Sequence, residues 1–149
     1  MMVNQNTNQD RIGKTALTKN DLKLCRDLRL KLNRIKAEIR QIDEDLRSPN
    51  TSRPWKARNN TYSAITITDT LLDKKDKLYS IYREKARCLY ALTLQIEKYL
   101  LFLSPTDGAL LRLYYIMGKT WPQVSEFMEY SEPQIYRLHR NLLRKMAQK

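Results

Sequence analysis

The chain contains little glycine, proline, histidine or cysteine, and each shortage excludes a class of structure or site. Only 3 of its 149 residues are glycine and 5 are proline, which argues against a turn-rich all-β fold and favours long helices. His139 is the one histidine, and Cys25 and Cys88 lie far apart without a CxxC pair, so a structural zinc site is excluded. No stretch reaches the roughly 20 apolar residues that span a bilayer. The sequence therefore predicts an all-α protein with no metal site and no membrane association.

Recognisable leader and catalytic motifs are also missing. The first ten residues are polar and rich in Asn and Gln, unlike a signal peptide, so we expect a cytoplasmic protein with reduced thiols. The acidic residues 43–45 stand next to Arg40 and Arg47, which is typical of a solvated helix end and not of a metal site. No glycine-rich phosphate loop is present. We therefore expect neither an enzyme nor a cofactor.

Acidic residues are in short supply relative to basic ones. The chain has 28 Lys and Arg against 16 Asp and Glu, a net charge of +12 at pH 7. Such a balance favours an anionic partner, which in general is either nucleic acid or a membrane surface, and of the two we expect nucleic acid. The plain alternative is a basic surface with no polyanion bound to it.

Two long apolar stripes predict a helical hairpin over residues 20–103, after a disordered or frayed start at 1–19. In each stripe apolar residues recur at alternating steps of three and four, as in a coiled coil, with one interruption of the second stripe at Lys85. The first stripe contains Cys25, Leu28, Leu32, Ile35, Ile39, Ile42 and Leu46, and the second contains Leu78, Tyr82, Leu89, Leu92, Ile96, Tyr99 and Leu103. Two such helices with a short connection favour an antiparallel pair.

The connection is predicted to be a basic loop over residues 48–66, around Trp55, with the second helix beginning near Thr68. Breaker signals such as Ser48-Pro49-Asn50 support that loop. A hairpin centred near residue 56 would place Cys25 and Cys88 at the same level. Because neither stripe can stay exposed, the hairpin must close on itself or on a partner, so homo-oligomerisation through the hairpin is also considered.

The segment 104–149 repeats one kind of helix start three times. Ser104, Thr120 and Ser131 are each followed by an early proline and then by Asp or Gln three residues on, which is the logic of a capping box. Gly118 supplies a stop for the first helix. The sequence thus predicts three short helices, at about 105–117, 121–128 and 132–147.

The apolar faces of these three helices can be buried only against one another. They consist of Leu110, Leu113, Tyr114 and Met117, then Trp121, Val124, Phe127 and Met128, then Ile135, Leu138, Leu142 and Met146. Only residues 129–131 separate the second helix from the third, and so tight a link forces the steep crossing of a helix-turn-helix unit. Tyr130 is expected to fill the core at the turn.

The third helix then leaves a basic face outward, with no acidic residue after Glu132. Arg reads guanine edges and Gln or Asn reads adenine, while residues later in a recognition helix more often meet phosphate. We therefore expect Gln134 and Arg137 to contact bases, and Arg140 and Arg144 to contact mainly phosphate. The full set of candidate DNA-binding residues is Pro133, Gln134, Tyr136, Arg137, Arg140, Asn141, Arg144 and Lys145. The alternative for all of them is a solvated basic helix face.

Residues 120–131, together with the run Tyr136-Arg137-Leu138-His139-Arg140, resemble the helix-turn-helix of sigma factor region 4. The whole chain resembles phage-encoded sigma-region-4-like transcriptional regulators of the ArpU/RinA type. Glu129 departs from the pattern, since it stands where sigma factors usually carry glycine. His139 matches the run, and we expect it to be a packing or phosphate-proximal residue, not a catalytic one.

The resemblance implies a phage or prophage regulator that binds double-stranded DNA in a bacterial host, with host RNA polymerase as a candidate partner. Two alternatives remain open at this stage. One is a small-terminase-like protein of DNA packaging, which also combines DNA binding with helical oligomerisation. The other is an inhibitor that binds RNA polymerase without touching DNA.

Overall fold

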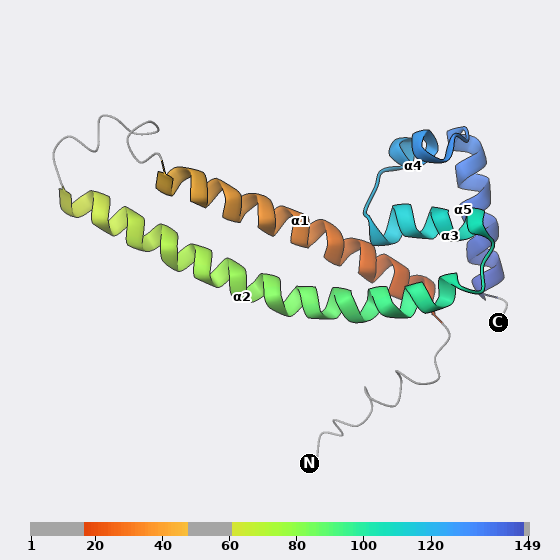
Figure 1. Cartoon of the computed structure of the whole chain (residues 1–149), viewed down its shortest axis with the longest axis horizontal. Coiled ribbons are helices and arrows are strands. Elements are labelled where there is room, and N and C mark those ends of the chain that lie inside the picture. The colour runs from red at the N-terminus through yellow and green to blue at the C-terminus, as the bar shows by residue number, and fades with distance from the viewer. Residues whose placement is uncertain (1–16, 48–60, 148–149) are drawn as a thin grey trace, which may run out of the picture. The chain divides into compact units, whose positions relative to one another are not determined.

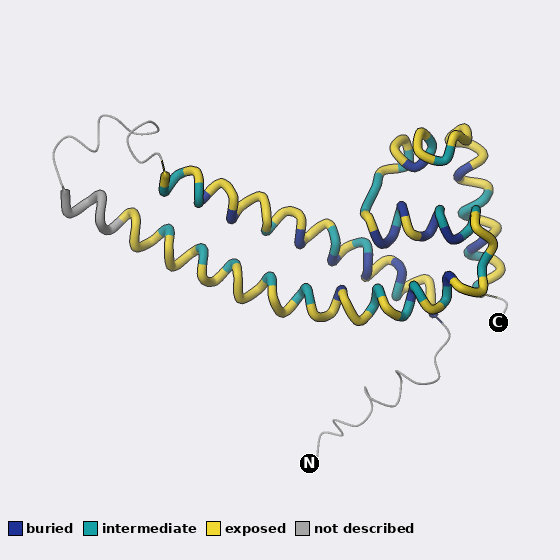
Figure 2. The backbone as a smooth tube through the Cα atoms, in the orientation of Figure 1, coloured by how far each residue is buried: buried dark blue, intermediate teal, exposed yellow. Residues whose placement is uncertain are grey.

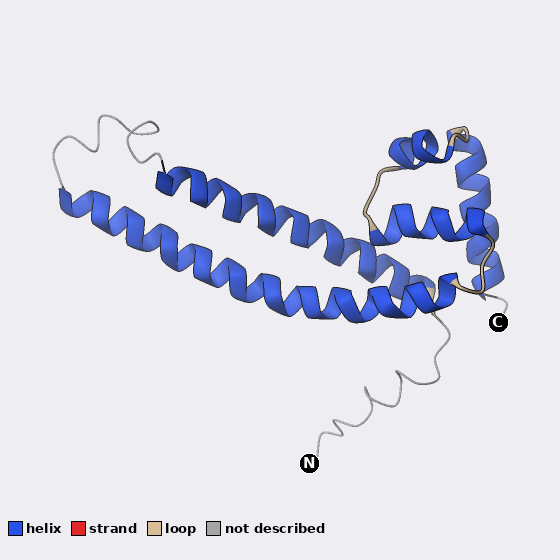
Figure 3. Ribbon diagram, viewed as in Figure 1, coloured by secondary structure: helices blue, strands red, loops and turns tan. Residues whose placement is uncertain are grey.

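Every regular element in the part of the chain that the structure describes is helical. The computed structural model describes residues 17–47 and 61–147, with side chains from residue 67 onward in the second range (Figures 1 and 3). The elements are α1 (Lys19–Arg47), α2 (Thr61–Leu100), α3 (Pro105–Leu111), the π-helix η2 (Arg112–Ile116), α4 (Trp121–Met128) and α5 (Glu132–Ala147). The all-α prediction is confirmed. None of the described helices is long and apolar enough to cross a membrane.

These residues fall into two compact units. One contains residues 27–91, and the other contains the described residues before 27 together with those from Leu92 onward. Helices α1 and α2 therefore each contribute to both units, and the two units are described separately below.

Helix α1 begins where its cap places it and buries the predicted stripe. Thr18 Oγ1 accepts the backbone N–H of Asp21, and Asp21 Oδ2 accepts that of Thr18, at 3.2 and 3.0 Å. This reciprocal pair satisfies two donors that have no partner inside the helix. The stripe residues Cys25, Leu28, Leu32, Ile39 and Ile42 are buried, and Ile35 and Leu46 are half-buried (Figure 2). Residues 1–16 of the predicted frayed start lie outside the described residues, but Leu17 is buried.

Helix α2 begins at Thr61, earlier than predicted. Residues 61–66, predicted from the sequence to belong to the loop, are therefore helical. Threonine and isoleucine weaken a helix only slightly, and the segment has no Pro or Gly to break it. The remainder of the predicted basic loop, including Trp55, lies outside the described residues.

In the unit of residues 27–91, two side-chain contacts join α1 and α2. Lys75 forms an ion pair with Asp43, and the Lys36 ammonium lies 5.8 Å from the centre of the Tyr82 ring. A step forward along α1 thus matches a step backward along α2, so the two segments run in opposite directions. The register inferred from Cys25 and Cys88 would have placed Lys36 level with Lys77, and that register is wrong. Stripe periodicity defines which face is buried, but it leaves the axial offset of the two helices undetermined.

The C-terminal helices begin at the predicted caps. Ser104 Oγ accepts the N–H of Asp107 at 3.2 Å. Thr120 and Gln123 form a reciprocal capping box that opens α4. The bounds of α4 and α5 equal those predicted from the sequence.

The first of the three predicted short helices is split by a π-turn, which changes its buried face. The Met117 N–H donates to the Arg112 carbonyl five residues back, at 2.9 Å. That wider turn rotates the following side chains away from 3.6-residue periodicity. Buried residues are consequently Leu110, Leu111, Leu113, Tyr115 and Ile116, while Met117 of the predicted face is exposed and Tyr114 is half-buried. Gly118 ends the segment at φ 71°, as predicted.

The core under α4 and α5 is smaller than the sequence predicts. Val124, Ile135 and Leu142 are buried. Phe127, expected on the inner face, is 74% exposed, and Tyr130 is exposed at the turn instead of filling the core. Helix α4 has only two turns, and Phe127 lies at the edge of the stripe centred on Val124, where the neighbouring helices do not cover it.

Candidate functional site

Arg26 of α1 connects the segment around Gly118 to the rest of its unit. Its Nη1 donates to the carbonyl oxygens of Tyr114 and Lys119 at 2.6 and 2.8 Å. Its guanidinium carbon lies 3.9 Å from the centre of the Tyr114 ring, a cation–π contact. The opposite neighbour of Tyr114 is Trp121 at the start of α4, stacked at 3.8 Å with planes 15° apart. Arg26 thereby supplies hydrogen-bond donors for the carbonyl of Tyr114, within η2, and for that of Lys119, just before α4.

His139 fixes the inner side of α5. Its Nε2 lies 2.6 Å from the Tyr115 hydroxyl, and Trp121 meets its ring edge-on at 4.8 Å. Burial, with a smaller contribution from the Lys19 charge, lowers the pKa of His139 to about 4. Burial likewise raises the pKa of Tyr115 to about 12, with Tyr114 adding to the rise and Arg26 opposing it. A neutral imidazole and a neutral phenol therefore share this hydrogen bond at neutral pH.

The outer side of α5 carries the candidate DNA-binding residues. All eight are exposed: Pro133, Gln134, Tyr136, Arg137, Arg140, Asn141, Arg144 and Lys145 (Figure 2). At 100° per residue, six of them share one broad arc centred on Arg137, and Tyr136 and Lys145 lie at its two edges. The opposite side of the helix buries Ile135 and Leu142.

The two edge residues have partners inside the protein. Tyr136 contacts Trp121, with ring centres 5.3 Å apart. Lys145 Nζ lies 3.8 Å from Asp107 Oδ2. Both therefore belong as much to the packing of α5 as to its outer face.

The three arginines of the arc, Arg137, Arg140 and Arg144, form no ion pair with the described residues. By contrast, Arg112 is held by Glu97 at 2.7 Å. Because α5 has no acidic residue after Glu132, the positive potential of this face is not neutralised locally.

Gln134 has a structural duty that competes with base reading. Its Oε1 accepts from the Ser131 backbone N–H at 3.0 Å and from the Ser131 hydroxyl at 3.2 Å. The side-chain carbonyl is thus committed to the α5 cap, and only the amide Nε2 remains for a ligand. Gln134 also lines a shallow hollow with Tyr130, Arg137 and Leu138.

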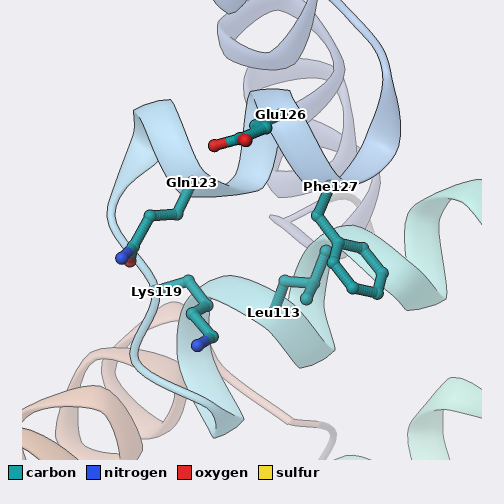
Figure 4. A pocket seen from close by; sticks show the side chains of 5 residues that line it. All are labelled: Leu113, Lys119, Gln123, Glu126 and Phe127. Carbon is teal, nitrogen blue, oxygen red and sulfur yellow. The ribbon is translucent and has the colours of Figure 1, made fainter.

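A second hollow, on the α4 side, was not predicted from the sequence. It is lined by Leu113, Lys119, Gln123, Glu126 and Phe127 (Figure 4). The Phe127 ring lies beside Leu113, with Gln123 and Lys119 on the opposite side of the opening (Figure 4). An exposed aromatic ring beside a hollow is a feature of protein-binding surfaces. Only the departure of Phe127 from the buried stripe reveals it, and that departure depends on tertiary packing.

Among the described residues, no group of three or more His, Cys, Asp or Glu side chains could hold a metal ion.

No protein-family model, curated protein or solved structure matches this chain.

Proposed function

We propose that this protein is a DNA-binding transcriptional regulator whose α5 enters the major groove of double-stranded DNA. The observation that carries the proposal is the outer face of α5, where Arg137, Arg140 and Arg144 are exposed and unpaired on a helix without acidic residues beyond its first turn. Exposed, unneutralised arginines on one helix are the electrostatic footprint of a nucleic-acid-binding surface.

The proposed architecture is a coiled-coil-like helical hairpin at 20–103 followed by a helix-turn-helix unit at 104–149. Helix α4, the short turn at residues 129–131 and α5 have the lengths of such a unit. The proposal includes the resemblance to sigma-region-4-like phage regulators and, with it, action in the cytoplasm of a bacterial host.

Within the proposed complex the residues have different roles. Arg137 lies in the second turn of α5 and contacts a base edge, with the Gln134 amide beside it. Arg140 and Arg144 contact phosphates. Pro133 and Asn141 complete the arc. Tyr136 and Lys145, at the two edges of the arc, lie near the DNA sugar-phosphate backbone.

Selection from a random duplex library with the purified full chain tests the proposal. A discrete enriched sequence motif is the expected result, because α5 offers side chains that discriminate bases. Recovery of no duplex above background would overturn the proposal.

A pair of variants separates base reading from positioning. Arg137→Ala should weaken binding to the selected site by about 1–3 kcal/mol and relax the preference at one base pair. Arg144→Ala should weaken selected and scrambled duplexes about equally. Both side chains are exposed, so circular dichroism should show an unchanged fold. Variants that both bind every duplex like the parent would show that α5 is not a recognition helix.

The hollow beside Phe127 favours a second candidate function, contact with RNA polymerase with or without DNA. Its exposed ring lies on α4, on a different helix from the arginine arc. Phe127→Ser should then abolish co-purification with polymerase while leaving DNA affinity unchanged. If DNA binding is absent and polymerase still co-purifies, the inhibitor alternative takes the place of the DNA proposal.

A further inference from the structure

Helix α2 carries a second stripe, turned by up to about 100° around the helix from the side chains that meet α1. The Lys75 ammonium lies 5.9 Å from the centre of the Tyr79 ring, between the two stripes. Tyr82 and Lys75 contact α1 through Lys36 and Asp43. The second stripe, which we name the outer stripe, consists of Leu72, Asp76, Tyr79, Arg83, Ala86 and Tyr90. Its steps alternate between four and three residues, which is the spacing of a coiled-coil seam. All of its members belong to the unit of residues 27–91.

The large side chains of the outer stripe are exposed. Leu72 is 44% exposed, Tyr79 38% and Tyr90 67%. Single exposed apolar residues are common, but these three lie on one face of α2, with Asp76, Arg83 and Ala86 between them, and together form a mixed apolar and charged surface that another helix can cover.

We propose that the outer stripe pairs with the outer stripe of a second copy of this chain, in an antiparallel two-fold arrangement. A pairing centred at the level of residue 81 places Leu72 against Tyr90 of the second copy and Tyr79 against Arg83 of the second copy. The first pair is apolar and the second is a cation–π pair. A two-fold axis makes each contact occur twice.

Charge complementarity selects this occupant and this direction. In the antiparallel arrangement Asp76 lies over the small Ala86 of the second copy, with Arg83 and Arg87 of that copy on either side. A parallel arrangement would instead oppose Asp76 to Asp76 and Arg83 to Arg83, and like charges in register are repulsive. Asp76 in the first half of the stripe and Arg83 in the second half therefore complement each other only in the antiparallel arrangement.

Sedimentation equilibrium of the full chain and of two charge-reversed variants tests the pairing. The parent chain should dimerise reversibly. Asp76→Arg and Arg83→Asp should each weaken self-association about tenfold or more, because each homodimer then opposes like charges twice. An equimolar mixture of the two variants should recover the dimer, since in the heterodimer the two reversed side chains are oppositely charged diagonal neighbours, as are the native Asp76 and Arg83. Native mass spectrometry identifies that heterodimer.

Glu84→Arg is the matched control, because it reverses a charge on α2 away from the outer stripe and should dimerise like the parent. Circular dichroism checks that all variants remain helical. A parent chain that stays monomeric at every concentration overturns the proposal. So does a mixture that associates no better than its components. Neither result bears on DNA binding by α5, which is measured separately.

Discussion

Arg26 of α1 lies over the Tyr114 ring and donates two hydrogen bonds to backbone carbonyls near Gly118. It is one of several basic residues on α1, yet its two hydrogen bonds and its place over Tyr114 bind α1 to the segment around Gly118. Arg26→Ala should lower the free energy of unfolding by about 2–3 kcal/mol, because two partly buried carbonyls lose a charged donor. The exposed Arg34 on the same helix is the control, and its replacement by Ala should change stability by less than about 0.5 kcal/mol. Urea denaturation measures both; equal effects would show that the Arg26 contacts do not stabilise the fold.

His139 should make stability depend on pH in a defined window. Its pKa is about 4 in the folded chain and about 6.5 in an unfolded one. Between these values the unfolded state binds more protons, so stability is full above pH 6.5 and falls as pH drops toward 4. His139→Gln keeps a hydrogen-bonding group for Tyr115 and removes the titration. The variant should therefore lose less stability than the parent across that window in thermal unfolding. Parallel curves for the two proteins would contradict the assignment.

At the scale of the elements, the turn between α4 and α5 contains local backbone strain. Glu129 has φ 59° and ψ 33°, a left-handed conformation that disfavours side chains and suits glycine. Glu129→Gly should raise the free energy of unfolding by about 0.5–1 kcal/mol. Glu126→Gly, in the exposed interior of α4, should lower it by about 1 kcal/mol. Chemical denaturation of both variants distinguishes a special turn position from a general effect of glycine. A Glu129→Gly variant no more stable than the parent would contradict the assignment of strain to this turn.

The starts of the C-terminal helices could be predicted from the sequence, whereas the π-turn and the offset between α1 and α2 could not. Caps such as Thr120 with Gln123 act through neighbouring backbone groups, so the start of each C-terminal helix could be predicted from local residues. The π-turn at Arg112–Ile116 could not, because it depends on packing that exposes Met117 and buries Tyr115. The offset between α1 and α2 was missed for a similar reason, since it is set by contacts such as Lys36 with Tyr82.

In the candidate site, too, some features follow from the local sequence and others depend on tertiary contacts. Exposure of Arg137, Arg140 and Arg144 follows from helical periodicity, which any amphipathic sequence reveals. The capping role of Gln134 and the contact of Lys145 with Asp107 depend on how neighbouring elements meet. Phe127 is the clearest case, because an apolar residue near a buried stripe is normally assigned to the core.

The chain carries a net charge of +12, and this charge contributes to DNA affinity only where its basic side chains contact phosphates. About four to six contacts from α5 and its flanks imply that the logarithm of DNA affinity falls with the logarithm of salt concentration with a slope of about −4 to −5 per bound chain. Fluorescence anisotropy with a labelled duplex at several salt concentrations measures this slope most directly. The double variant Arg140→Ala and Arg144→Ala should flatten it by about two units. A slope near zero for the parent chain, or an unchanged slope for the double variant, would contradict the assignment of α5 as the DNA-binding surface.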